Sequence, residues 1–352
     1  MRALAAIFAF VALAFATPAA PAPKRIEVRV VIVTTWEYEP NGKSVMGELK
    51  AWRERWPLPV AMPFPEGVHS LHYDPKTHVL AYVTGAATAR AAASTMALGL
   101  DPRLDFSHAY WVVAGIAGVD PKIGSVGSAA WARWIVDGDL GQEIDIREAP
   151  KDWPTGHFPF GRSKPYELPA PPHHAFEANS AYPLNASLVH WAYGLSRDVK
   201  LADDAKLAAL RKPYSGAAAK PPFVLEGETL ASSRFWYGAI ANEHARRWVD
   251  YWTGGKGVFA MSAEEDSGIM QGLTQLAAAG RVKLDRVLVL RSASDYTVGP
   301  AGMTAAELAA EEAKSQFPAI GAALENLYRT AAPVVHYLTD HWATTRDKVP
   351  GT

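Results

Sequence analysis

The chain has 352 residues, and 49% of them are hydrophobic, which is enough for one large or two ordinary domains. Its formal net charge is −1, so the composition gives no electrostatic sign of a nucleic-acid or anionic-membrane partner. The absence of cysteine excludes disulfides, thiolate metal sites and cysteine nucleophiles.

The N-terminus has the layout of a secretory signal peptide. Arg2 precedes an apolar run over residues 3–16, which ends in the small-x-small pattern Ala14-Phe15-Ala16. We therefore predict a signal peptide over residues 1–20, with cleavage near Ala16 to Ala20, and a protein secreted across the inner membrane into the periplasm. An uncleaved N-terminal anchor is the alternative. No later segment has the roughly 18 consecutive apolar residues of a membrane span, so none is expected in the mature chain.

Strand and helix patterns alternate along the rest of the sequence. Short apolar runs predict strands, and longer periodic segments predict helices. The expected strands are 26–33, 79–83, 110–114 and 286–290, and the expected helices are 88–98, 184–196, 203–210, 242–252, 265–279, 305–314 and 319–330. This order indicates an α/β layered fold, for which we expect a single domain over residues 24–345. Residues 150–185 have no clear period and are interpreted as a long surface loop.

Two acidic positions indicate a polar pocket. Asp295 follows the apolar run 286–290, and ligands of open α/β sheets bind at the carboxyl ends of the strands. Glu264, Glu265 and Asp266 begin a predicted helix. The alternative is a surface loop and a helix start whose dipole favours acidic residues. The histidines show no zinc-ligand spacing, so we expect no metal.

Three segments together resemble the nucleoside phosphorylase and nucleosidase superfamily. The first is residues 84–126, with Gly115-Ile116-Ala117-Gly118 and Ile123-Gly124-Ser125-Val126, although Ser125 stands where the family has Asp. The others are Glu265-Asp266-Ser267-Gly268 and Arg291-Ser292-Ala293-Ser294-Asp295. Within the superfamily, the leader, residues 34–40 (Thr-Thr-Trp-Glu-Tyr-Glu-Pro) and the long aromatic loop are most similar to the purine nucleoside permeases. The resemblance implies a three-layer αβα fold with a mixed central sheet, nucleoside phosphorylase-like.

The resemblance also implies roles for the acidic residues. Asp295 would act as the acid at purine N7, with Ser294 orienting its carboxyl group. Glu265 would bind the ribose hydroxyls. Glu39 matches the position at which hydrolases of the superfamily carry a water-activating Glu, which favours hydrolysis over phosphorolysis because an anionic base repels phosphate.

Further residues are candidates for substrate binding. Phe235 or Trp236 would stack on the base, although core packing explains either aromatic equally well. Gly85 and Gly115 would allow close approach of the backbone to the ligand, or simply make tight turns. Arg291 is a candidate phosphate ligand, with an ion-pair role as its alternative.

The sequence leaves two functions open. The protein binds a purine nucleoside and cleaves its N-glycosidic bond, or it binds the nucleoside without cleavage as part of an uptake system. The expected partner is a purine nucleoside, and no cofactor is expected unless phosphate serves as co-substrate. A homo-oligomer and an inner-membrane carrier both remain open.

Overall fold

A computed structural model describes residues 25–40, 43–174 and 179–352. The predicted signal peptide over residues 1–20 lies outside the described residues. In the described part of the chain, no helix is long and apolar enough to span a membrane.

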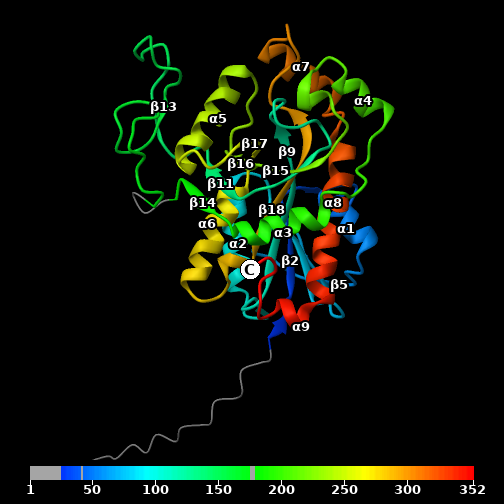
Figure 1. Ribbon diagram of the computed structural model, residues 1–352. Coiled ribbons are helices and arrows are strands. Elements are labelled where there is room, and N and C mark those ends of the chain that lie inside the picture. The colour runs from blue at the N-terminus through cyan, green and yellow to red at the C-terminus, as the bar shows by residue number, and fades with distance from the viewer. Residues whose placement is uncertain (1–24, 41–42, 175–178) are drawn as a thin grey trace, which may run out of the picture.

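A twelve-stranded mixed sheet forms the centre of the molecule (Figure 1). Its main path runs β14-β11-β16-β17-β9-β2-β7-β6-β5, and β18 joins through β9 and β10. The strands of this sheet are β2 (Val30–Thr34), β5 (Val60–Met62), β6 (Leu71–Asp74), β7 (Val79–Val83), β9 (Tyr110–Val119), β10 (Ala129–Trp131), β11 (Trp134–Asp137), β14 (Ala181–Pro183), β15 (Val224–Glu226), β16 (Glu228–Ala231), β17 (Phe259–Ala263) and β18 (Val287–Tyr296). Three two-stranded sheets pair β1 (Ile26–Glu27) with β8 (Leu104–Asp105), β3 (Glu37–Tyr38) with β4 (Met46–Gly47), and β12 (Gln142–Glu143) with β13 (His157–Phe158).

Helices cover both sides of the sheet, which confirms the expected α/β layered class. In Figure 1, α2 and α6 lie on one side of the central strands, and α1 and α8 lie on the other. The helices are α1 (Lys50–Arg55), α2 (Thr88–Leu100), α3 (Ala186–Ser196), α4 (Ala205–Arg211), α5 (Ala239–Thr253), α6 (Asp266–Ala278), α7 (Ala305–Ser315), α8 (Ile320–Asp340) and α9 (Trp342–Thr345).

The central strands are apolar because both of their faces are covered. All five residues of β2 are buried between its parallel neighbours β7 and β9. Such strands are continuous Val/Ile/Leu runs rather than alternating ones. β7 has the predicted bounds, whereas the predicted strand 26–33 is divided into β1 and β2.

Three predicted strand or helix ends were wrong by five residues or more, and one is that of β18, which does not end at residue 290 but continues to Tyr296. β9 does not end at residue 114 but continues to Val119, pairing in parallel with β18 so that Gly115 lies opposite Arg291. Helix α8 does not end at residue 330 but passes through Pro333 to Asp340. Its buried face, which includes Val334 and Leu338, packs against the sheet, so tertiary burial outweighs the local cost of proline.

The surface loop predicted over residues 150–185 begins earlier, after β11 at residue 138, and ends at residue 180, before β14; it is here called the excursion. In the described part of this segment, β12 and β13 are the regular elements, and the remainder is turns and irregular backbone. The excursion packs on α5, where Tyr251 Oη donates to the Glu167 carbonyl at 2.7 Å. The excursion therefore lies beside the end of the sheet at which β2 and β17 stop.

Candidate functional site

A pocket of about 280 Å³, here called the Asp295 pocket, lies where β2 and β17 end and where β9 and β18 continue past them. This is the edge at which ligands of α/β sheets bind. Its lining residues are Thr35, Trp36, Glu48, Ala86, Ile116, Ala117, Gly118, Arg234, Phe235, Ser262, Ala263, Glu264, Glu265, Ser294, Asp295, Phe317 and Ile320.

Asp295 reaches the pocket through a β-bulge. Ala293 pairs with Ala117 and Asp295 with Gly118, so Ser294 is the extra residue of β18. Bulges beside sites redirect side chains in this way. A Cβ at Gly118 would lie 2.8 Å from Asp295 Oδ1, so only glycine leaves room for the carboxyl group there.

The surroundings of Asp295 favour its protonated form. Burial raises the pKa of Asp295 to about 6, while the hydrogen bond that Ser294 Oγ donates to Oδ2 at 2.8 Å acts in the opposite direction. Glu312 of α7 is a further carboxyl group near it: burial and the charge of Asp295 raise the pKa of Glu312 to about 7. Glu312 Oε2 is buried and has no hydrogen-bond partner among the described residues. Two neighbouring carboxyl groups of this kind do not readily ionise together.

Glu48 lies at another part of the pocket wall, on the chain that returns from the β3–β4 hairpin. Its Oε2 accepts hydrogen bonds from the Thr35 amide at 2.5 Å and the Trp36 amide at 3.2 Å, and its Oε1 accepts one from the Ile116 amide at 2.7 Å. Burial raises the pKa of Glu48 to about 7. Its carboxyl group is therefore fixed in position and close to balanced between its two protonation states at neutral pH.

Glu265 is held by a buried ion cluster. Arg291 Nη2 donates to Glu265 Oε2 at 3.0 Å, and Arg291 Nε donates to Asp266 Oδ2 at 3.1 Å. The Ala87 amide donates to Glu265 Oε1 at 3.3 Å. Glu264 is half-buried in the same pocket wall, and burial followed by the charge of Glu265 raises its pKa. The pocket thus presents two adjacent carboxyl groups as hydrogen-bond acceptors.

Two of the predicted substrate-binding residues support this cluster from outside the pocket. Arg291 is 1% exposed and fully engaged with acidic side chains and the Ile116 carbonyl, so it is not available to an incoming phosphate. A Cβ at Gly115 would clash with the Arg291 guanidinium, so this glycine makes room for the arginine rather than for a ligand. Gly85 has a φ of +85° and also lies outside the lining, which its neighbour Ala86 joins.

Glu39 lies outside the Asp295 pocket, contrary to the sequence-based expectation. Its Oε1 pairs with Arg53 Nη1 at 2.5 Å and its Oε2 with His69 Nδ1 at 3.1 Å. Glu39 follows the outgoing strand of the β3–β4 hairpin, whereas the Glu48 amide donates to the Trp36 carbonyl at the base of the hairpin. Of these two residues, Glu48 is the one that lines the Asp295 pocket.

The two aromatic candidates are separated by the structure. Phe235 is 50% exposed and lines the pocket, with its ring centroid 5.9 Å from that of Phe317 across the opening. Trp236 is turned away, and its ring packs 6.2 Å from that of Phe259. Of the two, Phe235 is the one in a position to stack on a ligand.

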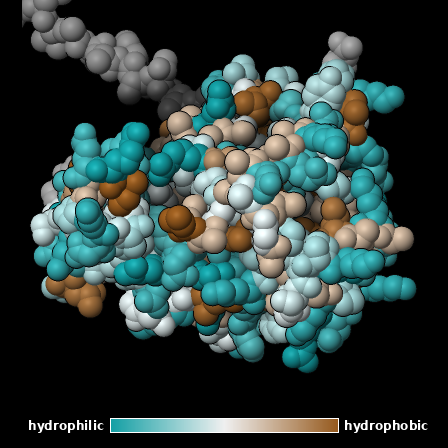
Figure 2. All heavy atoms as spheres, turned by 90° about the horizontal axis from the view of Figure 1, so that it is seen from above, coloured by the Kyte–Doolittle hydropathy of each residue, from teal (hydrophilic) through white to brown (hydrophobic). Residues whose placement is uncertain are grey.

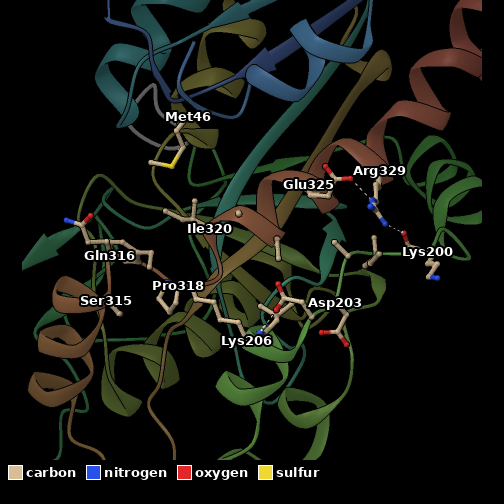
Figure 3. A pocket seen from close by; sticks show the side chains of 17 residues that line it. Met46, Lys200, Asp203, Lys206, Ser315, Gln316, Pro318, Ile320, Glu325 and Arg329 are labelled. Carbon is tan, nitrogen blue, oxygen red and sulfur yellow. Dashed lines mark hydrogen bonds and ion pairs between the residues drawn. The ribbon is translucent and has the colours of Figure 1, made fainter. Parts of the chain in front are cut away.

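Two larger cavities adjoin the Asp295 pocket. The Arg329 cavity, of about 740 Å³, shares Phe317 and Ile320 with it and is shown in Figure 3. The Phe235 cavity, of about 970 Å³, shares Arg234 and Phe235. Figure 2 looks down on this end of the molecule and shows hydrophobic residues near its centre among hydrophilic ones. Within residues 25–40, 43–174 and 179–352, no three His, Asp or Glu side chains are grouped so that they could hold a metal ion.

Comparison with known proteins identifies the relatives of this chain. The family model described as purine nucleoside permease (NUP) matches residues 27–350. The probable purine nucleoside permease of Schizosaccharomyces pombe is 30% identical over 279 residues, which cover 78% of this chain and 79% of that protein. The purine nucleoside permease of Candida albicans is 28% identical over 264 residues, 74% of this chain and 63% of that protein, so the match spans less than two thirds of it.

Solved structures with the same fold include a nucleosidase and a hydrolase. The 5'-methylthioadenosine/S-adenosylhomocysteine nucleosidase of Neisseria meningitidis is 15% identical with a TM-score of 0.50, over 86% of this chain and 98% of that one. The futalosine hydrolase of Helicobacter pylori is 14% identical with a TM-score of 0.51, over 89% of this chain and 97% of that one. At this identity the likeness shows the fold alone. It confirms the expected nucleoside phosphorylase-like architecture.

Proposed function

The chain belongs to the purine nucleoside permease family, and we propose that it binds a purine nucleoside in the Asp295 pocket and cleaves its N-glycosidic bond with water. The observation that carries this proposal is the presence of two buried carboxyl groups, Asp295 and Glu48, in the wall of one pocket of about 280 Å³. Their pKa values are raised to about 6 and about 7, near the range in which acid and base catalysts work at neutral pH.

The two groups divide the chemistry between them. The C1′–N9 bond breaks with its electron pair going to the purine, and protonated Asp295 supplies a proton to N7 of the leaving base. Ionised Glu48 accepts a proton from the water whose oxygen bonds to C1′. Ser294 donates to Asp295 Oδ2, so it orients the acid. Glu265 and Glu264 accept hydrogen bonds from the ribose hydroxyls, and Phe235 stacks on the base.

The charges of the pocket favour water over phosphate as the nucleophile. Glu48, Glu264 and Glu265 are all in its lining, and Arg291 is already paired with Glu265 and Asp266. An anionic phosphate would therefore meet carboxylates without a free buried guanidinium. Hydrolysis is therefore favoured over phosphorolysis, in which phosphate would be the co-substrate.

A second candidate function rests on the names of the relatives, which are called permeases. In this role the protein would bind a purine nucleoside in the periplasm and present it, uncleaved, to an inner-membrane carrier. The pocket lining is compatible with binding alone, because Glu265 and Phe235 would act on a nucleoside in the same way.

The experiment is to incubate purified protein with adenosine or inosine, with and without phosphate, and to measure the free base. Base released without phosphate supports hydrolysis, and base released only with phosphate contradicts the role given to Glu48. Saturable binding with no base released supports the uptake function. Asp295→Asn serves as the matched variant, because it keeps the shape of the side chain and removes the acid.

A further inference from the structure

The Phe235 cavity is more than three times as large as the Asp295 pocket, at about 970 Å³ against about 280 Å³. Three segments enclose it: residues 143–157 of the excursion, residues 234–241 before and within α5, and residues 298–305 at the start of α7. A volume in this range is typical of small-molecule sites. The reaction proposed above uses none of this cavity beyond the two residues that it shares with the Asp295 pocket.

The cavity opens from the Asp295 end of the pocket. Phe235 and Arg234 line both spaces, and the ring of Phe235 lies 5.0 Å from that of Tyr237 in the cavity wall. Tyr237 is close enough to Asp295 for the carboxylate charge to contribute to a raised tyrosine pKa, after burial as the main cause. Val298 and Gly299 follow Asp295 along the chain and line the same wall.

Its lining is mainly apolar and aromatic. Ile144, Ile146, Ile240 and Met303 have exposed fractions of 37%, 48%, 80% and 37%, although they are large hydrophobic residues. The charged side chain at the junction, Arg234, lies 3.8 Å from both Asp139 and Glu143. An apolar group entering from the pocket would cover this hydrophobic surface without leaving a buried charge unpaired.

The cavity on the other side of the pocket has a different chemistry. Figure 3 shows charged side chains around the Arg329 cavity, where Arg329 Nε pairs with Glu325 Oε1 at 2.6 Å. Lys200, Asp203, Asp204 and Lys206 also belong to its lining. The charged space meets the Asp295 pocket at Phe317 and Ile320, whereas the apolar space meets it at Arg234 and Phe235.

We infer that the Phe235 cavity is a second subsite, which takes an apolar or aromatic substituent carried on the purine ring. This inference rests on the proposed function, because Asp295 then faces N7 of the base. The purine edge that contains N7 also carries the substituent at position 6, and this edge points past Phe235 into the cavity. The ligand class is therefore purine nucleosides with a bulky hydrophobic group at position 6.

The test compares adenosine with N6-benzyladenosine by calorimetric titration of the Asp295→Asn protein, in which cleavage is blocked. We expect N6-benzyladenosine to bind about tenfold more tightly, the effect of removing roughly 55 Å² of apolar surface from water. The double variant Ile240→Asp, Met303→Asp in the same background should remove most of this preference and leave adenosine binding unchanged. Val258→Asp is the matched control, since Val258 is a 50% exposed valine outside the lining of the Phe235 cavity.

The outcomes separate the subsite from the proposed function. If adenosine binds but the benzyl group gives no gain, the subsite is disproved while nucleoside binding stands. If the gain persists in the double variant, the group lies elsewhere and the subsite is again disproved. If neither nucleoside binds to the Asp295→Asn or the unmodified protein, the proposed function itself is overturned.

Discussion

Arg291 Nη2 donates a hydrogen bond to Glu265 Oε2 at 3.0 Å, and both side chains are buried. The arginine is thus the counter-ion of a pocket residue. Arg291→Met would leave Glu265 and Asp266 buried without a cation, and we expect a loss of about 3–5 kcal/mol in the free energy of unfolding. Urea unfolding measures this loss. Arg147→Met is the control, because Arg147 pairs with Asp145 at the surface with its side chain 85% exposed, and it should behave as the unmodified protein does.

Glu48 and Glu39 give opposite predictions for the reaction with water. Glu48→Gln removes the proposed base and should lower the hydrolysis rate by about 10²- to 10⁴-fold, with nucleoside affinity largely retained. Glu39→Gln should leave the rate close to that of the unmodified protein, because its partners Arg53 and His69 lie with it outside the Asp295 pocket. Initial rates of base release check both. A large loss for Glu39→Gln and none for Glu48→Gln would return the role to Glu39.

The hydrolysis rate should have an optimum between about pH 6 and about pH 7, the pKa values of Asp295 and Glu48. The protonated fraction of Asp295 falls as the pH rises, and the ionised fraction of Glu48 grows. Ser294→Ala removes the hydrogen bond that lowers the pKa of Asp295, so this pKa should rise and the optimum should move to higher pH. Ser215→Ala, at an exposed position outside the Asp295 pocket, provides the comparison and should leave the profile in place.

The buried carboxyl group of Asp295 also predicts how stability depends on pH. Its pKa is raised from 3.8 to about 6 in the folded protein, so folding favours the protonated form. The raised pKa therefore adds roughly 3 kcal/mol to the free energy of unfolding at low pH. This stabilisation is fully present below about pH 4 and is lost as the pH rises through about 6. Asp295→Asn should therefore lose less stability than the unmodified protein between pH 4 and pH 8, as urea unfolding at both values would show. Asp198→Asn, at a 90% exposed side chain, should keep the original dependence.

Phe235→Ala should weaken binding of purine nucleosides by about 10- to 100-fold, because stacking of a base on an aromatic ring contributes roughly 1–3 kcal/mol. The free energy of unfolding should change little, since the Phe235 side chain is half exposed. Titration with adenosine measures the effect. Leu168→Ala, at a 76% exposed residue outside the Asp295 pocket, is the control, and equal losses in both variants would contradict the stacking role.

The sequence predicted the elements that depend on local pattern. β7 and the start of α2 have their predicted positions, and Asp295, Ser294 and Glu265 come together in one pocket as expected. These residues end or follow strongly apolar segments, so the sheet determines where they lie. The sequence did not identify Glu48, because its place depends on the antiparallel pairing of β3 with β4. No local sequence pattern distinguishes Glu39, which follows β3, from Glu48, which follows β4.

The sequence left Arg291 open between a ligand role and an ion-pair role and did not connect it with Gly115, for a related reason. Their contact arises from the parallel register of β9 and β18, strands separated by more than 160 residues. A residue type alone does not show whether an arginine faces a ligand or a neighbouring acid. The long α8 illustrates the same limit, since burial against the sheet carries it past Pro333.

The β-bulge at Ser294 accommodates an extra residue in β18 while Asp295 keeps its place opposite Gly118. A regular strand would place Asp295 on the same side as Arg291 and Ala293, but the register resumes one residue later opposite Gly118. With Ser294 deleted, Asp295 would follow Ala293 directly and would still lie on the side of Gly118. What the extra residue adds is its hydroxyl group, which donates to Asp295 Oδ2. The bulge thus lets β18 carry the serine that holds the acid without moving the acid from the side of Gly118.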